Sequence, residues 1–106
     1  MLKRQKRRYI VVHVTSDSRV DQKDFLAAVW KAVEKLYGEY GASKTGLALI
    51  DFEDEKKRAT LRVMNAGIVI VRAALASVTR IGDTPVSLRV LRVSGTIKSL
   101  RDKIGT

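Results

Sequence analysis

The sequence has no cysteine, which excludes disulfide bonds and thiolate metal sites. It has one histidine, His13, and no HxH or HExxH motif, so it lacks the imidazole pairs from which common zinc sites are built. No apolar run reaches the roughly 18 residues of a membrane span, and the N-terminus has no apolar secretory segment. We therefore expect a soluble, cytoplasmic protein that binds no metal or other cofactor itself and has no membrane partner.

Catalytic motifs are missing as well. The chain has no glycine-rich phosphate loop and no nucleophile motif that could combine with His13. Its acidic cluster over residues 51–55 lacks the spacing of a calcium loop and suits a solvated hairpin turn. We therefore expect no catalytic residue in this chain.

Positive charge is what the chain has in excess, with a net charge of +10 over 106 residues. Residues 1–8 and 80–106 are strongly basic, whereas the two signs nearly balance over residues 9–79. Such asymmetry indicates a polyanionic partner, and the alternative is a surplus of charge that only keeps the protein soluble. The candidate RNA-binding residues are Lys3, Arg4, Lys6, Arg7, Arg8, Arg89, Arg92, Lys98, Arg101 and Lys103.

Hydrophobic periodicity predicts the order β-α-β-β-α-β followed by a C-terminal helix. The expected strands span residues 9–15, 47–52, 59–64 and 86–93, and the expected helices span residues 21–37, 66–79 and 97–104. This order is typical of the α+β class, a ferredoxin-like or RRM-like sandwich whose antiparallel sheet has the strand order 4-1-3-2. Residues 1–8 would form a flexible basic arm, and residues 9–106 a single domain. The arm would then lie beside the end of the fourth strand.

One face of this sheet is a candidate contact surface. Alternation along the first and fourth strands could turn Tyr9, Val11, Leu91 and Val93 away from the two long helices, unless the inward face is misassigned. The final helix or a protein partner would cover such an apolar face. Because the third strand has no aromatic residue, we expect RNA to be recognised through its backbone and shape rather than by base stacking. The candidate protein-interface residues are Tyr9, Val11, Leu91, Val93 and Ile68.

Several segments of the chain are similar to one known family. They are Val29-Trp30-Lys31-Ala32, the stretch from Tyr37 to Leu47 with its Gly-Ala-Ser motif, Val71-Arg72-Ala73-Ala74-Leu75-Ala76, and Arg89 to Lys98 with its Val-Ser-Gly-Thr-Ile-Lys motif. In these segments the chain resembles the protein component 2 family of archaeal ribonuclease P, which the eukaryotic enzyme shares. The resemblance implies an α/β sandwich and a noncatalytic, RNA-binding subunit of the ribonucleoprotein endonuclease that removes the 5′ leader from precursor tRNA. The RNA of that enzyme carries the active site with its magnesium ions.

The same resemblance implies the partners of the chain. They are the ribonuclease P RNA, precursor tRNA within the holoenzyme, ribonuclease P protein component 3, and a second copy of the chain in a two-plus-two assembly. The segment from Gly67 to Ile70 is more apolar than the resemblance leads us to expect, and it marks a further candidate contact.

Two other hypotheses remain open, and with them the question of whether the isolated chain is an enzyme. One is a small enzyme of the same fold, similar to acylphosphatase, for which Arg19 and Asn65 occupy loosely suitable places but the phosphate-cradling loop is absent. The other is a ligand-sensing or oligomerisation module.

Overall fold

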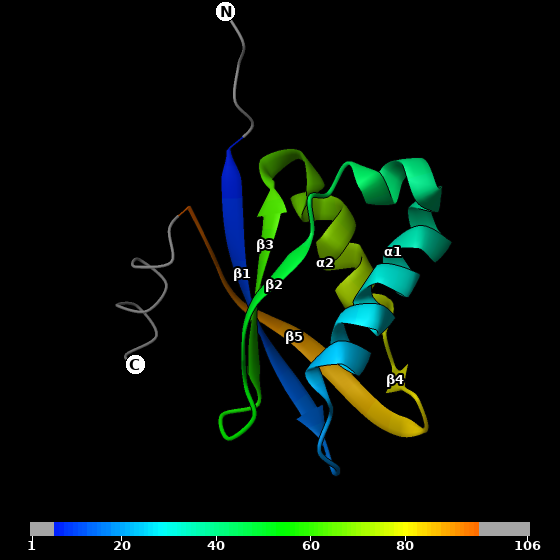
Figure 1. Ribbon diagram of the computed structural model, residues 1–106, viewed down its shortest axis with the longest axis vertical. Helices are drawn as coiled ribbons and strands as arrows, with labels where there is room; N and C mark the ends of the chain where they lie inside the picture. The colour runs from blue at the N-terminus through cyan, green and yellow to red at the C-terminus, as the bar shows by residue number, and fades with distance from the viewer. Residues whose placement is uncertain (1–5, 96–106) are drawn as a thin grey trace, which may run out of the picture.

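An antiparallel sheet with two helices on one face makes up the structure, a computed structural model that describes residues 6–95 (Figure 1). The elements are β1 (Arg7–Ser16), α1 (Gln22–Ser43), β2 (Ala48–Glu53), β3 (Arg58–Met64), the 3-10 helix η1 (Asn65–Gly67), α2 (Ile68–Ser77), β4 (Arg80–Ile81) and β5 (Thr84–Ser94). The α+β fold predicted from the sequence is therefore confirmed.

The strands follow the order β2-β3-β1-β5-β4 in space. With β5 as the fourth predicted strand, this is the order 4-1-3-2, so the predicted topology is confirmed. The two-residue strand β4 was not predicted, and it pairs only with Thr84 and Pro85 at the start of β5. Tyr9 is paired with Ser94, so the start of β1 lies beside the end of β5, as expected.

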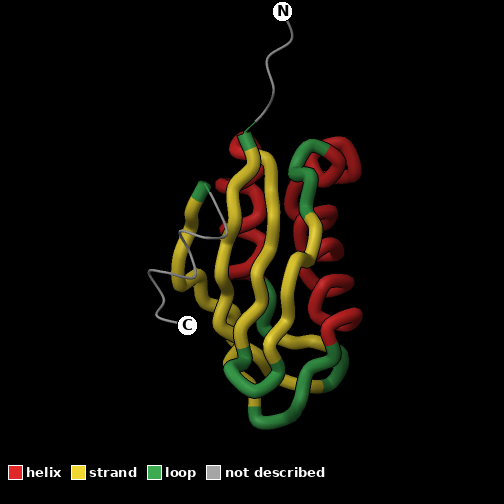
Figure 2. Tube along the Cα trace, turned by 60° about the vertical axis from the view of Figure 1, so that its left-hand side comes forward, coloured by secondary structure: helices red, strands yellow, loops and turns green. Residues whose placement is uncertain are grey.

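The core fills the space between the sheet and the helices. The core side chains of β1 are Ile10, Val12 and Val14, which alternate with the residues of the other face, where Val11 is buried as well. The Phe25 ring of α1 meets the Phe52 ring of β2 in a tilted arrangement, with the centroids 5.5 Å apart. The other fully buried large side chains are Val29 and Val33 of α1, Leu61 and Val63 of β3, and Val71 and Leu75 of α2. Figure 2 shows both helices on this one side of the sheet.

Helix α1 begins where the Asp21 carboxylate accepts a hydrogen bond from the Lys23 amide at 3.1 Å, so Asp21 is the N-cap. The helix continues beyond its predicted end, but Gly38, with φ of 75°, interrupts the helical geometry. The buried stripe formed by Phe25, Val29 and Val33 does not continue to Leu36 and Tyr37, although both lie within the predicted helix, and these two side chains are exposed. No helix within residues 6–95 is long and apolar enough to cross a membrane.

The boundary predicted between the basic arm and the domain is two residues too late. Strand β1 already includes Arg7 and Arg8, which are paired with Met64 and Val63, because β3 extends far enough to hold them. The predicted C-terminal helix over residues 97–104 lies outside the described residues. The same holds for the candidate RNA-binding residues Lys3, Arg4, Lys98, Arg101 and Lys103.

Candidate nucleic-acid interface

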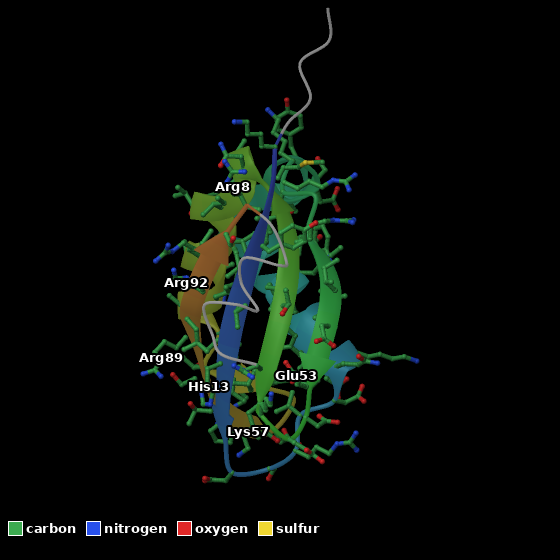
Figure 3. The ribbon with its side chains drawn as sticks, turned by 90° about the vertical axis from the view of Figure 1, so that its left-hand side faces the viewer. Arg8, His13, Glu53, Lys57, Arg89 and Arg92 are labelled. Carbon is green, nitrogen blue, oxygen red and sulfur yellow. The ribbon has the colours of Figure 1, made fainter. Side chains whose placement is uncertain are left out.

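The face of the sheet opposite to α1 and α2 is polar, and no helix within residues 6–95 covers it (Figure 3). Strands β1, β3 and β5 together contain no acidic residue. The pairing register places on this face Tyr9, Val11, His13 and Thr15 of β1, Arg58, Thr60 and Arg62 of β3, and Ser87, Arg89, Arg92 and Ser94 of β5. We refer to this surface, with its four arginines, as the arginine face.

A β-bulge in β5 brings two of these arginines to the same face. Val12 is paired with Val90 and the preceding Val11 with Arg92, which leaves Leu91 as the extra residue. Strict alternation would turn Arg89 and Arg92, three residues apart, to opposite faces. The bulge shifts the alternation by one residue, so both arginines flank β1 on the open side.

The same bulge also determines the side of the sheet to which Val93 is turned. This residue is paired with Ile10 and packs against the hydrophobic core, so its predicted place on the open face was wrong. Val11 does lie on the open face, but it is buried, while Leu91 at the bulge is 38% exposed. Tyr9 is half-buried there. The predicted apolar face is therefore a polar one.

Ile68, the remaining candidate for a protein interface, is half-buried and packs against the core at the start of α2. Its neighbour Val69 is 76% exposed. The apolar segment that opens α2 thus turns one side chain inward and the next one to the surface.

The side chains of the four arginines on the arginine face form no ion pair or hydrogen bond within residues 6–95. Arg58 and Arg89 both lie opposite His13, on either side of β1, so their Cα atoms are about 10 Å apart, which is two strand spacings. At that distance two like charges in water repel by about 0.4 kcal/mol. The Nε atom of Arg58 is moreover buried without a hydrogen-bond partner. A bound polyanion would relieve the repulsion and supply acceptors to these donors.

His13 lies between two of the arginines, opposite Arg58 on one side and Arg89 on the other (Figure 3). Its Nδ1 atom lies 3.2 Å from the Thr15 hydroxyl oxygen, within hydrogen-bond distance. The ring is half-buried. Three side chains that can donate hydrogen bonds to phosphate therefore form one row across three neighbouring strands.

Acidic residues flank the arginine face on one side only. Along β2, Asp51 is paired with Thr60 and Glu53 with Arg58. The Glu53 carboxylate lies 3.7 Å from the Lys56 ammonium group and is partly exposed. Negative side chains therefore border the arginine face at β2, so a polyanion would bind over β3, β1 and β5.

Basic residues at the start of the described chain lie at one end of the sheet, where the register puts Arg7 on the arginine face and Arg8, opposite Val63, on the helical side. Arg7 is exposed and Arg8 is half-buried. The Arg8 guanidinium donates a hydrogen bond to the Arg7 carbonyl oxygen at 3.1 Å. A Cβ atom at Gly95 would lie 3.6 Å from the same guanidinium, so Arg8 reaches the end of β5. Lys6 is exposed, and its carbonyl oxygen accepts a hydrogen bond from the Asn65 amide at 2.7 Å.

Arg7, Arg8, Arg89 and Arg92 were predicted from the sequence as candidate RNA-binding residues, whereas the arginines of β3 were not. Arg58 and Arg62 alternate with buried residues along the strand, which is the signal that could have revealed them.

The structure argues against the acylphosphatase-like alternative. Arg19 follows the end of β1 and Asn65 follows the end of β3, and these antiparallel strands put the two residues at opposite ends of the sheet. The Arg19 guanidinium donates a hydrogen bond to the Asp54 carboxylate at 3.0 Å, which raises the pKa of Arg19 and engages its charge. The two residues therefore cannot hold one substrate between them. Within residues 6–95 no three acidic, histidine or cysteine side chains gather as they would around a metal ion.

Within residues 6–95, an α/β sandwich exposes a sheet face with arginines that form no ion pair, an arrangement typical of polyanion-binding domains. Comparison with known proteins is consistent with this class. The sequence profile of the Rpp14/Pop5 family matches residues 8–105. The chain belongs to this family, and the resemblance seen in the sequence is confirmed.

Among curated relatives, ribonuclease P protein component 2 of Pyrococcus furiosus is 32% identical over 100 residues, which cover 94% of this chain and 83% of the relative. The protein of the same name from Thermococcus kodakarensis has the same identity and coverage. The one from Methanococcus aeolicus is 30% identical over 94% of this chain and 73% of its own length. A chain in the cryo-EM structure of yeast ribonuclease MRP superposes with a TM-score of 0.72 at 14% identity, covering 99% of this chain and 95% of that one, which supports the fold alone.

Proposed function

We propose that this chain is a noncatalytic, RNA-binding subunit of ribonuclease P. The single observation that carries the proposal is the arginine face, in a chain whose curated relatives are ribonuclease P protein component 2. The chain would support the fold of the catalytic RNA while that RNA removes the 5′ leader from precursor tRNA.

The arginine face suits contacts with the RNA backbone. A guanidinium group donates two parallel hydrogen bonds to a phosphate, whereas RRM domains stack bases on aromatic rings of the sheet. The register places two rings on this face, those of Tyr9 and His13. The β3 residues opposite them are Arg62 and Arg58, which have no ring. Affinity would thus depend mainly on charge and on the shape of the RNA, with little preference for sequence.

The proposal includes the rest of the assembly. The protein partner would be ribonuclease P protein component 3, and two copies of each subunit would form a two-plus-two assembly in the cytoplasm. The chain itself would bind no cofactor, because the magnesium ions of the reaction would be held by the RNA.

Reconstitution tests the proposal. Ribonuclease P RNA and component 3 are combined with precursor tRNA at low magnesium, with and without this chain. We expect the chain to accelerate cleavage about tenfold or more, which corresponds to ~1.4 kcal/mol of transition-state stabilisation. Equal rates with and without the chain would contradict the proposal.

A further inference from the structure

A groove on the helical side of the molecule lies between α1 and the segment that joins α2 to β4. Its volume is about 370 Å³. Figure 1 shows the end of α2 and strand β4 beside α1. The residues that line it are Ala28, Lys31, Ala32, Lys35 and Leu36 of α1, Ser77 of α2, Val78, Thr79, and Arg80 of β4. We refer to it as the α1–β4 groove.

The groove exists because two side chains of α1 are short. Ala28, Ala32 and Leu36 follow one another at intervals of four residues and form a single row along the helix. The two alanines do not reach across to β4, and Leu36, which is 49% exposed, leaves an apolar side chain open at one end. The floor is therefore apolar and accessible.

The charged side chains that line the groove are all positive. Lys31 and Lys35 form a second row on α1, and Arg80 lies on the β4 side. None of these three cations forms an ion pair within residues 6–95, and no carboxylate lines the groove. The nearest acids along the chain, Glu34 and Asp83, are exposed and do not line it.

We infer that the α1–β4 groove docks an acidic, amphipathic segment of a partner protein. One apolar side chain of that segment would fill the space above Ala28 and Ala32, and its carboxylates would meet Lys31, Lys35 and Arg80. A protein segment fits better than an RNA backbone, because the floor is apolar and phosphates gain nothing from it.

The groove and the arginine face lie on opposite sides of the sheet, so the chain can bind RNA on one side and protein on the other (Figures 1 and 3). The inference rests on the proposed function, since the partner within the proposed assembly is component 3. The inference adds where on this chain component 3 would bind and which kinds of side chain would form the contact.

Three variants, each with a control, test the groove in titrations of the full chain with component 3. Ala32→Leu fills the groove, and we expect it to weaken the complex at least tenfold. Its matched control, Ala27→Leu, places the same side chain on the exposed side of α1 and should leave the affinity unchanged. Lys31→Gln and Lys35→Gln should each cost roughly two- to fivefold, as expected for rim charges, and Arg72→Gln on α2 serves as their control.

The possible results distinguish a failure of the groove inference from a failure of the proposed function. If the wild type binds component 3 and accelerates cleavage while Ala32→Leu binds component 3 equally well, the inference is wrong and the proposed function stands. If Lys31→Gln and Lys35→Gln weaken RNA binding without component 3, the groove is an RNA site and the inference is again overturned. If the wild type neither binds component 3 nor affects cleavage, the proposed function itself fails. Thermal unfolding of each variant confirms that it is folded.

Discussion

Removing the charge of the arginine face should change how RNA binding depends on salt. The variant combines Arg58→Gln, Arg62→Gln, Arg89→Gln and Arg92→Gln. We expect each substitution to change the free energy of unfolding by only ~0.5 kcal/mol, because none of the four side chains forms an ion pair or hydrogen bond within residues 6–95. A change in RNA affinity can then be attributed to the lost charges.

The size of the effect follows from the number of guanidinium groups. Each phosphate contact contributes about 0.7 to 0.9 to the slope of log K against log salt concentration. If each of the four arginines meets one phosphate, the slope of the variant is smaller by about 3. Over a fourfold rise in salt, from about 50 to 200 mM, the wild type should lose roughly 60-fold more affinity than the variant.

Fluorescence anisotropy with ribonuclease P RNA over this salt range measures the slope. The control variant loses the same charge on the helices, through Lys23→Gln, Lys31→Gln, Lys35→Gln and Arg72→Gln, and should keep the slope of the wild type. If the slope decreases equally in both variants, only the net charge of the protein matters. That result would refute the reasoning for a defined interface.

Two further predictions concern the loop between α1 and β2, which helps to hold α2 in place. The buried Thr45 hydroxyl donates a hydrogen bond to the Ala42 carbonyl at 2.8 Å and accepts one from the Leu47 amide at 3.2 Å, so Thr45→Val should lower the free energy of unfolding by about 1–3 kcal/mol in urea denaturation. A Cβ atom at Gly67 would lie 2.7 Å from the Thr45 Cα atom, so Gly67→Ala should destabilise by about 1–3 kcal/mol. Gly95→Ala, where the nearest atom is 3.6 Å away, is its control, and equal stability of both alanine variants would contradict this account of the packing.

Much of the fold follows from the sequence because local patterns determine it. The alternation of Ile10, Val12 and Val14 and the spacing of Phe25, Val29 and Val33 each lead to one buried face, and the structure has both. The strand order then follows from the known handedness of crossover connections.

The candidate site depended on a feature that the sequence does not show. In β5, the run from Arg89 to Val93 can alternate in either of two ways, and the bulge at Leu91 results from pairing with β1 rather than from any local signal. Strict alternation therefore placed Val93 outside, while the structure places it in the core. The groove beside α1 was equally hidden, since it depends on how far Ala28 and Ala32 lie from β4.

The most direct test of the central claim, that the arginine face contacts ribonuclease P RNA, uses the absence of cysteine. A single Thr60→Cys substitution places a thiol in the middle of that face, and Ala27→Cys places one on the exposed side of α1. Each thiol is linked to an iron chelate that cleaves nearby RNA in the reconstituted enzyme. We predict strong, localised cleavage of the RNA from position 60 and little from position 27. Cleavage from position 27 with none from position 60 would contradict the account.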